Sequence, residues 1–97
     1  MFSSIRRYTV KRGTVEELTR RVQEGFVPMV RRMKGFKGYY LINGGQDVLI
    51  AVSVFETAEG ALACNEKAAD WVKTNVLGST TGAPEVIVGD VLISQVK

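Results

Sequence analysis

The segment from Asp47 to Phe55 (DVLIAVSVF) constrains the fold more than any other part of this chain. It is rich in β-branched residues and predicts a strand, yet both faces of that strand are apolar. Because a large apolar side chain left in water forfeits roughly 1.5–3 kcal/mol, both faces need cover, and helices on one side supply only half of it. We therefore expect the helix-free face to be an interaction surface covered by a second copy of the chain, in a two-fold homodimer. The two faces carry Val48, Ile50, Val52 and Val54, and Leu49, Ala51, Ser53 and Phe55.

The other patterns predict one domain, residues 1–97, in the order strand, helix, strand, strand, helix, strand. Right-handed crossovers place both helices on one face of a four-stranded antiparallel sheet, an α+β sandwich of the ferredoxin-like βαββαβ type. A capping box at Thr14 starts the first helix, Pro28 must kink or split it, and Gly35 ends it. The expected strands are Ser4–Lys11, Lys37–Asn43, Asp47–Phe55 and Glu85–Gln95, with a second helix from about Ala58, capped by Thr57, to Leu77 and a loop over Ser79–Ala83.

Composition removes several classes of chemistry. The chain has no histidine, which excludes Ser-His-Asp and Cys-His catalysis, histidine metal sites and a histidine-ligated haem. Its single cysteine, Cys64, cannot form an internal disulfide or a multi-thiolate metal site, and is expected to be an inert small hydrophobe. We expect no metal and no cofactor.

Positive charge is concentrated in the first forty residues, which hold ten basic groups against three acidic ones, while the whole chain carries +3. Such an asymmetry is compatible with a nucleic-acid surface, but the third strand lacks the exposed aromatic residues on which sheet proteins stack bases. We expect a solvated helix face and no nucleic-acid partner. No apolar run approaches the roughly 18 residues of a membrane span, and residues 1–10 lack the core of an export signal. The expected location is therefore the cytoplasm, with no membrane partner.

The second predicted helix carries the strongest candidates for a ligand site. Its apolar stripe is mostly alanine, and Asn65 interrupts the stripe near its middle. The Asn65 amide either bonds a backbone carbonyl or a water molecule, or acts as a donor aimed into a pocket between helix and sheet. Trp71 flanks the same stripe beside Ala68, where its ring either packs in the core or forms a pocket wall.

The strands supply the other candidates. Successive strand residues point to opposite faces, so only one of Tyr39 and Tyr40 faces the helices, and the same holds for Arg6 and Arg7. An arginine that points inward needs an anion or a buried carboxylate. We take Asn65 and Trp71 as candidate catalytic residues, and Tyr39, Tyr40, Arg7 and Ala68 as candidate substrate-binding residues.

The order of elements, the doubly apolar sheet, and the stretch CNEKAADWVKTNV leading to PEVIVGDVL resemble the antibiotic biosynthesis monooxygenase-like proteins of the dimeric α+β barrel superfamily. The resemblance covers essentially the whole chain. It implies that two sheets face each other across a dimer and that each subunit holds a ligand between its sheet and helices. It also implies an asparagine and a tryptophan in that pocket, at positions that correspond here to Asn65 and Trp71.

Enzymes of this superfamily include monooxygenases of aromatic polyketides that use no metal or flavin, and haem-degrading enzymes, which need an axial histidine that this chain lacks. The resemblance therefore implies a cofactor-free monooxygenase that acts on a small aromatic, quinol-like or polyketide-like molecule. The alternative is a homodimeric small-molecule-binding protein without catalysis, which the absence of an obvious general base favours.

Overall fold

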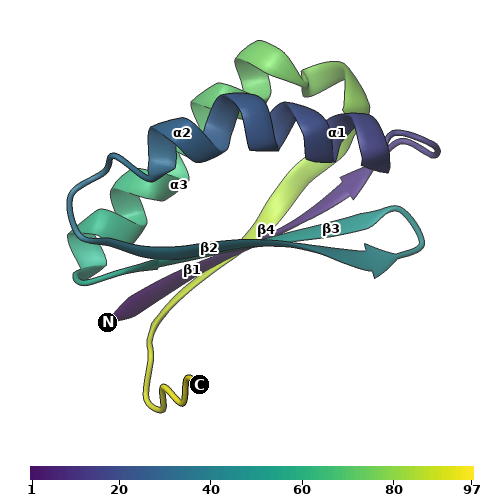
Figure 1. The fold of residues 1–97 in the computed structure, drawn as a ribbon. Coiled ribbons are helices and arrows are strands. Elements are labelled where there is room, and N and C mark those ends of the chain that lie inside the picture. The colour runs from purple at the N-terminus through teal and green to yellow at the C-terminus, as the bar shows by residue number, and fades with distance from the viewer.

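The computed structural model describes the whole chain, residues 1–97, as one four-stranded antiparallel sheet with its helices on a single face (Figure 1). The strands lie in the order β2-β3-β1-β4, which confirms the predicted ferredoxin-like βαββαβ arrangement. Both helical connections cross over the sheet on the same side, so one face is covered and the other is open. The strands are β1 (Phe2–Val10), β2 (Phe36–Gly45), β3 (Val48–Phe55) and β4 (Thr80–Asp90).

The first helical segment changes its hydrogen bonding midway. Helix α1 (Val15–Arg21) leads into a π-helical turn, η1 (Val22–Phe26), and then into the short helix α2 (Val27–Val30). Pro28 has no backbone N–H, and the wider turn before it, in which the Val27 N–H donates to the Val22 carbonyl, shifts the bonding register. The predicted interruption at Pro28 is thus confirmed.

Two details of this segment differ from expectation. The Thr14 hydroxyl donates to the Lys11 carbonyl and caps no helical N–H, so the predicted capping box is absent. Glu17, its expected partner, instead accepts from the arginines one turn further on. The helix also ends at Val30, before Gly35, whose φ of +81° turns the chain into β2.

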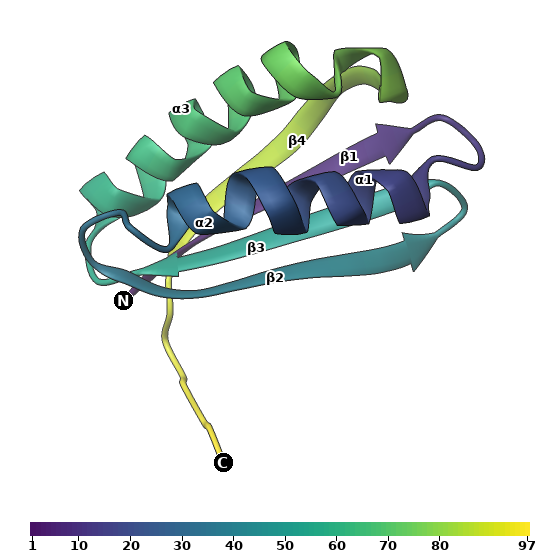
Figure 2. The ribbon, with the colours of Figure 1, turned by 45° about the horizontal axis from the view of Figure 1, so that its top comes forward.

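The second helix, α3 (Ala58–Asn75), begins as predicted, with the Thr57 hydroxyl accepting from the Gly60 N–H at 3.1 Å. A short 3-10 turn, η2 (Leu77–Ser79), follows it. In Figure 2, α3 lies over β1 and β4, whereas the α1–α2 segment lies over β3 and β2. The two helical segments therefore lie side by side in one layer, and each covers about half of this face of the sheet.

The last strand was predicted several residues too late. It begins at Thr80, inside the predicted loop, and ends at Asp90, because β1 supplies partners only between Val10, opposite Thr80, and Phe2, opposite Asp90. The residues after Val91 leave the sheet, as the tail in Figures 1 and 2 shows. Leu92 and Ile93, which the predicted strand Glu85–Gln95 included, are 88% and 85% exposed in that tail.

The apolar character of both faces of β3 is confirmed, and only one face is covered. Leu49, Ala51, Ser53 and Phe55 are buried beneath the helices, while the alternate valines and isoleucine on the open face remain half-buried. The strand register continues this open face across the whole sheet. One row joins Ile87, Ile5, Val52 and Tyr40, one residue from each strand.

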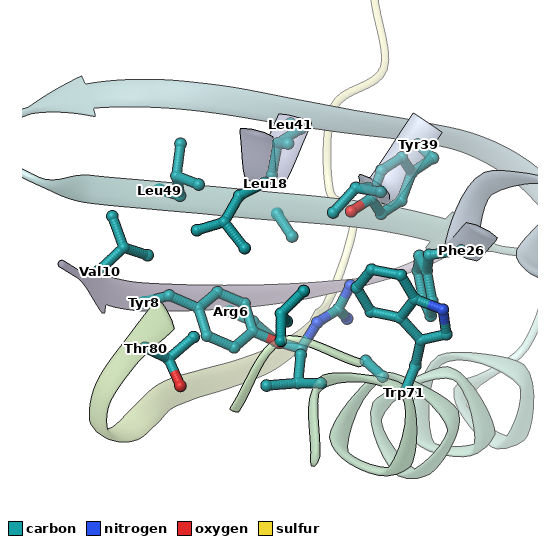
Figure 3. Close-up of a pocket in the computed structure, with 15 residues that line it drawn as sticks. Arg6, Tyr8, Val10, Leu18, Phe26, Tyr39, Leu41, Leu49, Trp71 and Thr80 are labelled. Carbon is teal, nitrogen blue, oxygen red and sulfur yellow. The ribbon is translucent and has the colours of Figure 1, made fainter. Parts of the chain in front are cut away.

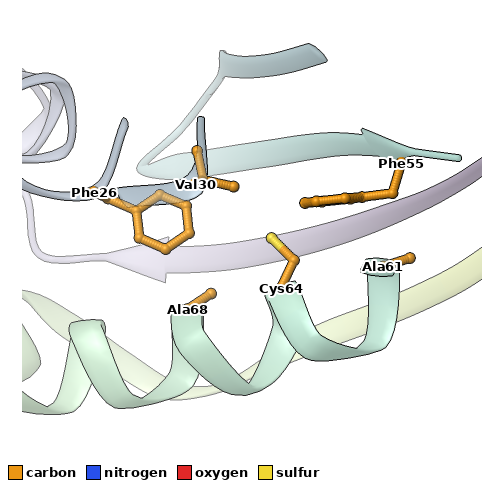
Figure 4. Close-up of a cluster of buried hydrophobic side chains, with 6 residues drawn as sticks. All are labelled: Phe26, Val30, Phe55, Ala61, Cys64 and Ala68. Atoms are coloured by element: carbon orange, nitrogen blue, oxygen red, sulfur yellow. The ribbon is translucent and has the colours of Figure 1, made fainter. Parts of the chain in front are cut away.

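The core under the helices consists of two separate clusters. Figure 4 shows the larger one, in which α3 contributes only small side chains, Ala61, Cys64 and Ala68, against Phe26, Val30 and Phe55. The smaller cluster contains Val10, Leu18, Leu49 and Val76. Trp71 packs against both clusters. The space between the clusters forms an apolar cavity.

Candidate functional site

A cavity of about 40 Å³ lies between the sheet and the helices, where the two core clusters separate (Figure 3). Most of its lining is apolar, with side chains from β1, β2, β3, α1, η1 and α3. The small side chain of Ala68 leaves space that a larger residue would fill, as the alanine stripe of this helix suggested. At this size the cavity holds on the order of three water molecules.

One wall of the cavity is aromatic. The ring of Phe26 lies 5.8 Å from that of Trp71 and 5.6 Å from that of Tyr39, and both pairs are tilted at more than 50°. Gly25 permits this approach, because a Cβ atom there would lie 3.1 Å from the indole Nε1 and Cζ2 of Trp71. Such a wall is suited to a planar aromatic ligand.

The polar centre of the site is Arg6, which projects from β1 into this apolar interior and is only 2% exposed. Its Nη1 donates to Ser4 Oγ at 3.1 Å and to Asn65 Oδ1 at 3.0 Å, and its Nη2 donates to Ser53 Oγ at 3.0 Å. The Ser4 hydroxyl also donates to Asn65 Oδ1. The third nitrogen of the guanidinium group, Nε, is buried and has no partner.

None of the groups that hold Arg6 is charged. The five ion pairs of the structure join other basic residues to acids on the surface, and no aspartate or glutamate lines the cavity. Buried charges in proteins are normally paired, because removing an ion from water without compensation is expensive. The Arg6 guanidinium thus places an uncompensated positive charge, with a free N–H donor, in a water-poor site.

Two phenols share this site. Burial raises the pKa of Tyr39 to about 12, against a smaller opposing effect of the Arg6 charge. Burial also raises the pKa of Tyr8, with the same opposition from Arg6. Both hydroxyl groups therefore keep their protons at neutral pH, and neither neutralises the guanidinium group.

The structure brings together three of the residues predicted for a pocket, Tyr39, Ala68 and Trp71, which all line the cavity. Asn65 lies beside it, in an open groove between α3 and β4. Its carbonyl oxygen is occupied by Arg6 and Ser4, a partner arrangement different from the backbone or water bond considered from the sequence. Asn65 therefore acts on the cavity through Arg6, as a residue that positions the guanidinium group.

Two other predicted residues lie elsewhere. Arg7 is on the open face of the sheet, where it pairs with Glu85 at 3.1 Å and stays half exposed. Tyr40 is 62% exposed on that same face and borders only a groove at the β2 edge. The inward positions belong to Arg6 and Tyr39, so this placement corrects the choice of Arg7 and removes Tyr40 from the cavity.

Sequence reasoning missed Tyr8, Ser4 and Ser53 as parts of the site. The available signal was the strand period, since Ser4, Arg6 and Tyr8 alternate along β1 and Ser53 lies opposite Ser4.

Cys64 is fully buried, and its thiol donates to Ser53 Oγ at 3.4 Å. No group of three or more cysteine, aspartate or glutamate side chains is placed to hold a metal ion. None of the helices has the length and apolar character that crossing a membrane requires.

Solved structures with this fold are numerous, and the likeness to them is one of fold alone. A protein of unknown function from Nitrosomonas europaea has a TM-score of 0.82 at 14% identity, with 99% of this chain and 93% of the other covered. A candidate antibiotic biosynthesis monooxygenase from Bordetella bronchiseptica has a TM-score of 0.77 at 18% identity, with 95% and 97% covered. MhuD, as an Arg-to-Ser variant with two manganese protoporphyrin IX molecules in each active site, has a TM-score of 0.77 at 20% identity over 100% of both chains.

Among curated proteins no sequence matches the chain. Its sequence over residues 1–71, which extend from the start of β1 to Trp71, matches the family model of the antibiotic biosynthesis monooxygenases. That range includes the arginine network, the aromatic wall and most of α3. The chain belongs to the antibiotic biosynthesis monooxygenase family.

Proposed function

We propose that this protein is a monooxygenase that oxidises a small hydroxylated aromatic or polyketide-like molecule with dioxygen, without a metal or flavin. The observation that carries the proposal is the buried, uncompensated guanidinium group of Arg6 in an apolar cavity with an aromatic wall. Family membership supports the reaction class. The absence of a counter-charge supports a ligand that brings its own negative charge.

In this proposal Arg6 replaces a general base. A phenol or enol bound beside a buried cation ionises more readily, because its anion is stabilised where water is scarce. The proton leaves to solvent, and the Tyr8 and Tyr39 hydroxyls, which stay protonated, serve as additional donors to the oxyanion. The cavity lining contains no carboxylate that could take this proton.

The ionised substrate then reacts with dioxygen at its electron-rich carbon. One electron passes from the anion to dioxygen, the two radicals combine through a new C–O bond, and the resulting hydroperoxide loses water. For a reacting methylene group the balance is R–CH2–R′ + O2 → R–CO–R′ + H2O, so the substrate supplies all four electrons. The role of the protein is to hold the ring against Trp71, stabilise the anion and exclude competing water.

The test measures oxygen uptake with a panel of anthrones, naphthols and hydroquinones, and follows label from ¹⁸O2 into the product. We expect one labelled oxygen atom in each ketone formed from a methylene group. Arg6→Met removes the oxyanion partner and is expected to lower kcat/KM on the order of 100-fold or more. Arg12→Met removes an exposed arginine just beyond β1 and is the matched control, with unchanged turnover.

The outcomes distinguish a monooxygenase from a small-molecule-binding protein without catalysis. Full turnover by Arg6→Met would remove Arg6 from the mechanism. Ligand binding without oxygen uptake across the panel would favour a small-molecule-binding protein without catalysis.

We also propose that the open face of the sheet packs on a second copy of the chain. Its support is the apolar row across all four strands, Ile87, Ile5, Val52 and Tyr40, of which Ile87 and Tyr40 are each 62% exposed in the single chain. An apolar patch of this kind is typical of a protein–protein interface. A two-fold dimer would bury this face and leave the helix-covered cavity of each subunit intact.

A further inference from the structure

A second hollow adjoins the cavity on the far side of Arg6. It is an open groove of about 300 Å³ between α3 and β4, bordered by Asn65 and Lys73 on the helix and by Gly82 and Pro84 on the strand. Arg6 and Tyr8 line both the groove and the cavity. The two hollows thus meet at the guanidinium group and the neighbouring phenol.

The groove is positively charged and has no acid of its own. Lys73 is exposed at its rim and takes part in no ion pair, although Asp70 lies one helical turn before it. No aspartate or glutamate borders the groove or the cavity. The two hollows together therefore present two cations, Arg6 at the base and Lys73 at the mouth, to one ligand path.

The small volume of the cavity also indicates that a ligand extends beyond it. A cavity of about 40 Å³ is far below the roughly 300–1,000 Å³ of sites that enclose a drug-sized ligand. A bicyclic or tricyclic molecule that reaches the aromatic wall must therefore extend out of the cavity, either past Arg6 into the groove between α3 and β4 or past Tyr39 into the groove at the β2 edge, and only the first path runs along Arg6. The part of the ligand that lies there meets Lys73 and the unoccupied amide nitrogen of Asn65, which are groups suited to an acid.

We propose that the substrate is an aromatic carboxylic acid whose hydroxyl-bearing ring lies in the cavity at Arg6 and whose carboxylate lies in the groove at Lys73. As a statement about substrate it rests on the proposed function, but as a statement about binding it is tested without turnover. Lys73 is then a specificity residue, which selects acids over neutral molecules of the same shape. Because it lies away from the reacting carbon, it contributes equally to the bound ground state and the transition state.

The probes are 6-hydroxy-2-naphthoate and its neutral amide, 6-hydroxy-2-naphthamide. Trp71 is the only tryptophan, so its single indole N–H signal in a proton–nitrogen NMR spectrum reports occupation of the cavity. We expect both probes to shift this signal, with the naphthoate bound about 10-fold more tightly. Lys73→Met is expected to remove about threefold to fivefold of that preference, in line with the modest strength of an exposed charge. High salt is expected to reduce the preference in the same way.

Lys67→Met is the matched control, because Lys67 is exposed on the same helix but borders neither hollow. It is expected to keep the full preference for the acid. Equal affinity for acid and amide, an equal loss in Lys67→Met, or no indole shift with millimolar naphthoate would each overturn the proposal.

Turnover separates this proposal from the one above. If hydroxylated acids are oxidised, Lys73→Met is expected to raise KM about threefold to fivefold and leave kcat unchanged. Oxygen uptake that is unchanged in Lys73→Met would refute the acid-binding groove and support the monooxygenase. Binding of acids that depends on Lys73, with no oxygen uptake, would support the groove and refute the monooxygenase.

Discussion

Each face of the sheet carries some residues whose polarity does not match their exposure. On the covered face, neighbouring strands place Ser4 opposite Ser53, with Arg6 next along β1, and all three are buried. On the open face the adjacent row contains Ile5 and Val52, both partly exposed. A sheet built only for its own stability would have the polar groups outside and the aliphatic ones inside.

These two mismatches are what the functions proposed above would require. The covered face accepts an energetic penalty in order to hold a donor group where water is scarce, which is the condition under which a guanidinium group stabilises an anion most effectively. The open face gains nothing from its aliphatic side chains until another surface removes them from water. On these proposals, one layer of strands would serve a ligand on one side and a second copy of the chain on the other.

The largest expected effect comes from breaking the open face. Val52→Asp places a carboxylate at the centre of the apolar row, and a two-fold dimer would bury two of them, unpaired. We expect the dimer dissociation constant, measured by sedimentation equilibrium, to rise on the order of 1,000-fold. Thr74→Asp, on the exposed side of α3, is the control and should leave it unchanged. Wild-type protein that sediments as a monomer at micromolar concentration would contradict the dimer itself.

The covered face is probed next through Tyr39, whose pKa rises from 10.0 to about 12 on folding because of burial. Between these values the unfolded chain loses the phenolic proton while the folded chain keeps it, so stability that is complete below pH 10 falls as the pH approaches 12. The loss amounts to about 2–3 kcal/mol over this range. In urea unfolding, Tyr39→Phe is expected to match the wild type at pH 8 and to show a smaller decline above pH 10. Parallel declines in the two proteins would show that Tyr39 titrates normally.

Gly60 tests how tightly the covered face is packed beyond the cavity. An added Cβ would lie 2.9 Å from Cδ1 of Phe55, a ring that is fully buried and cannot move aside. The overpacking outweighs the better helix propensity of alanine, so Gly60→Ala is expected to lower the free energy of unfolding by about 1–2 kcal/mol. Gly78→Ala, where a Cβ meets nothing within 4 Å, should lower it by nothing measurable. An equal change in the free energy of unfolding for Gly60→Ala and Gly78→Ala would mean that the core near Phe55 accommodates an added methyl group as easily as the surface does.

The fold was predictable because local signals agreed with one another. The β-branched strand segments, the Thr57 cap and Pro28 each marked a feature that the structure contains. The limits of β4 were not predictable, because they are set by the length of β1 across the sheet and by no residue within β4 itself. Long-range pairing of this kind leaves no local mark in the sequence.

The sequence predicted which residue pairs contribute to the site, but not which member of each pair faces the helices. The pairs Arg6–Arg7 and Tyr39–Tyr40 each had to contribute one inward side chain, and an apolar pattern on both faces gave no means of choosing. The structure chooses through register, since Tyr39 lies opposite Ser53 and Ser53 lies opposite Ser4. Asn65 was recognised as unusual, but its role as a support for Arg6 depends on that same register.

Arg6→Met tests directly whether the buried polar group of the covered face lowers stability, although its expected effect on stability is the smallest of those predicted. Methionine has a similar length and needs no partner, while Ser4 still bonds to Asn65 and the Cys64 thiol still bonds to Ser53. Removing an uncompensated buried charge is therefore expected to raise the free energy of unfolding by about 1 kcal/mol, measured by urea denaturation at matched protein concentration. The same substitution is expected to abolish most turnover, which is the signature of a group kept for function at the expense of stability. A loss of 2 kcal/mol or more would instead identify Arg6 as a structural bridge between β1, β3 and α3, and its lack of a carboxylate partner would then say nothing about a ligand.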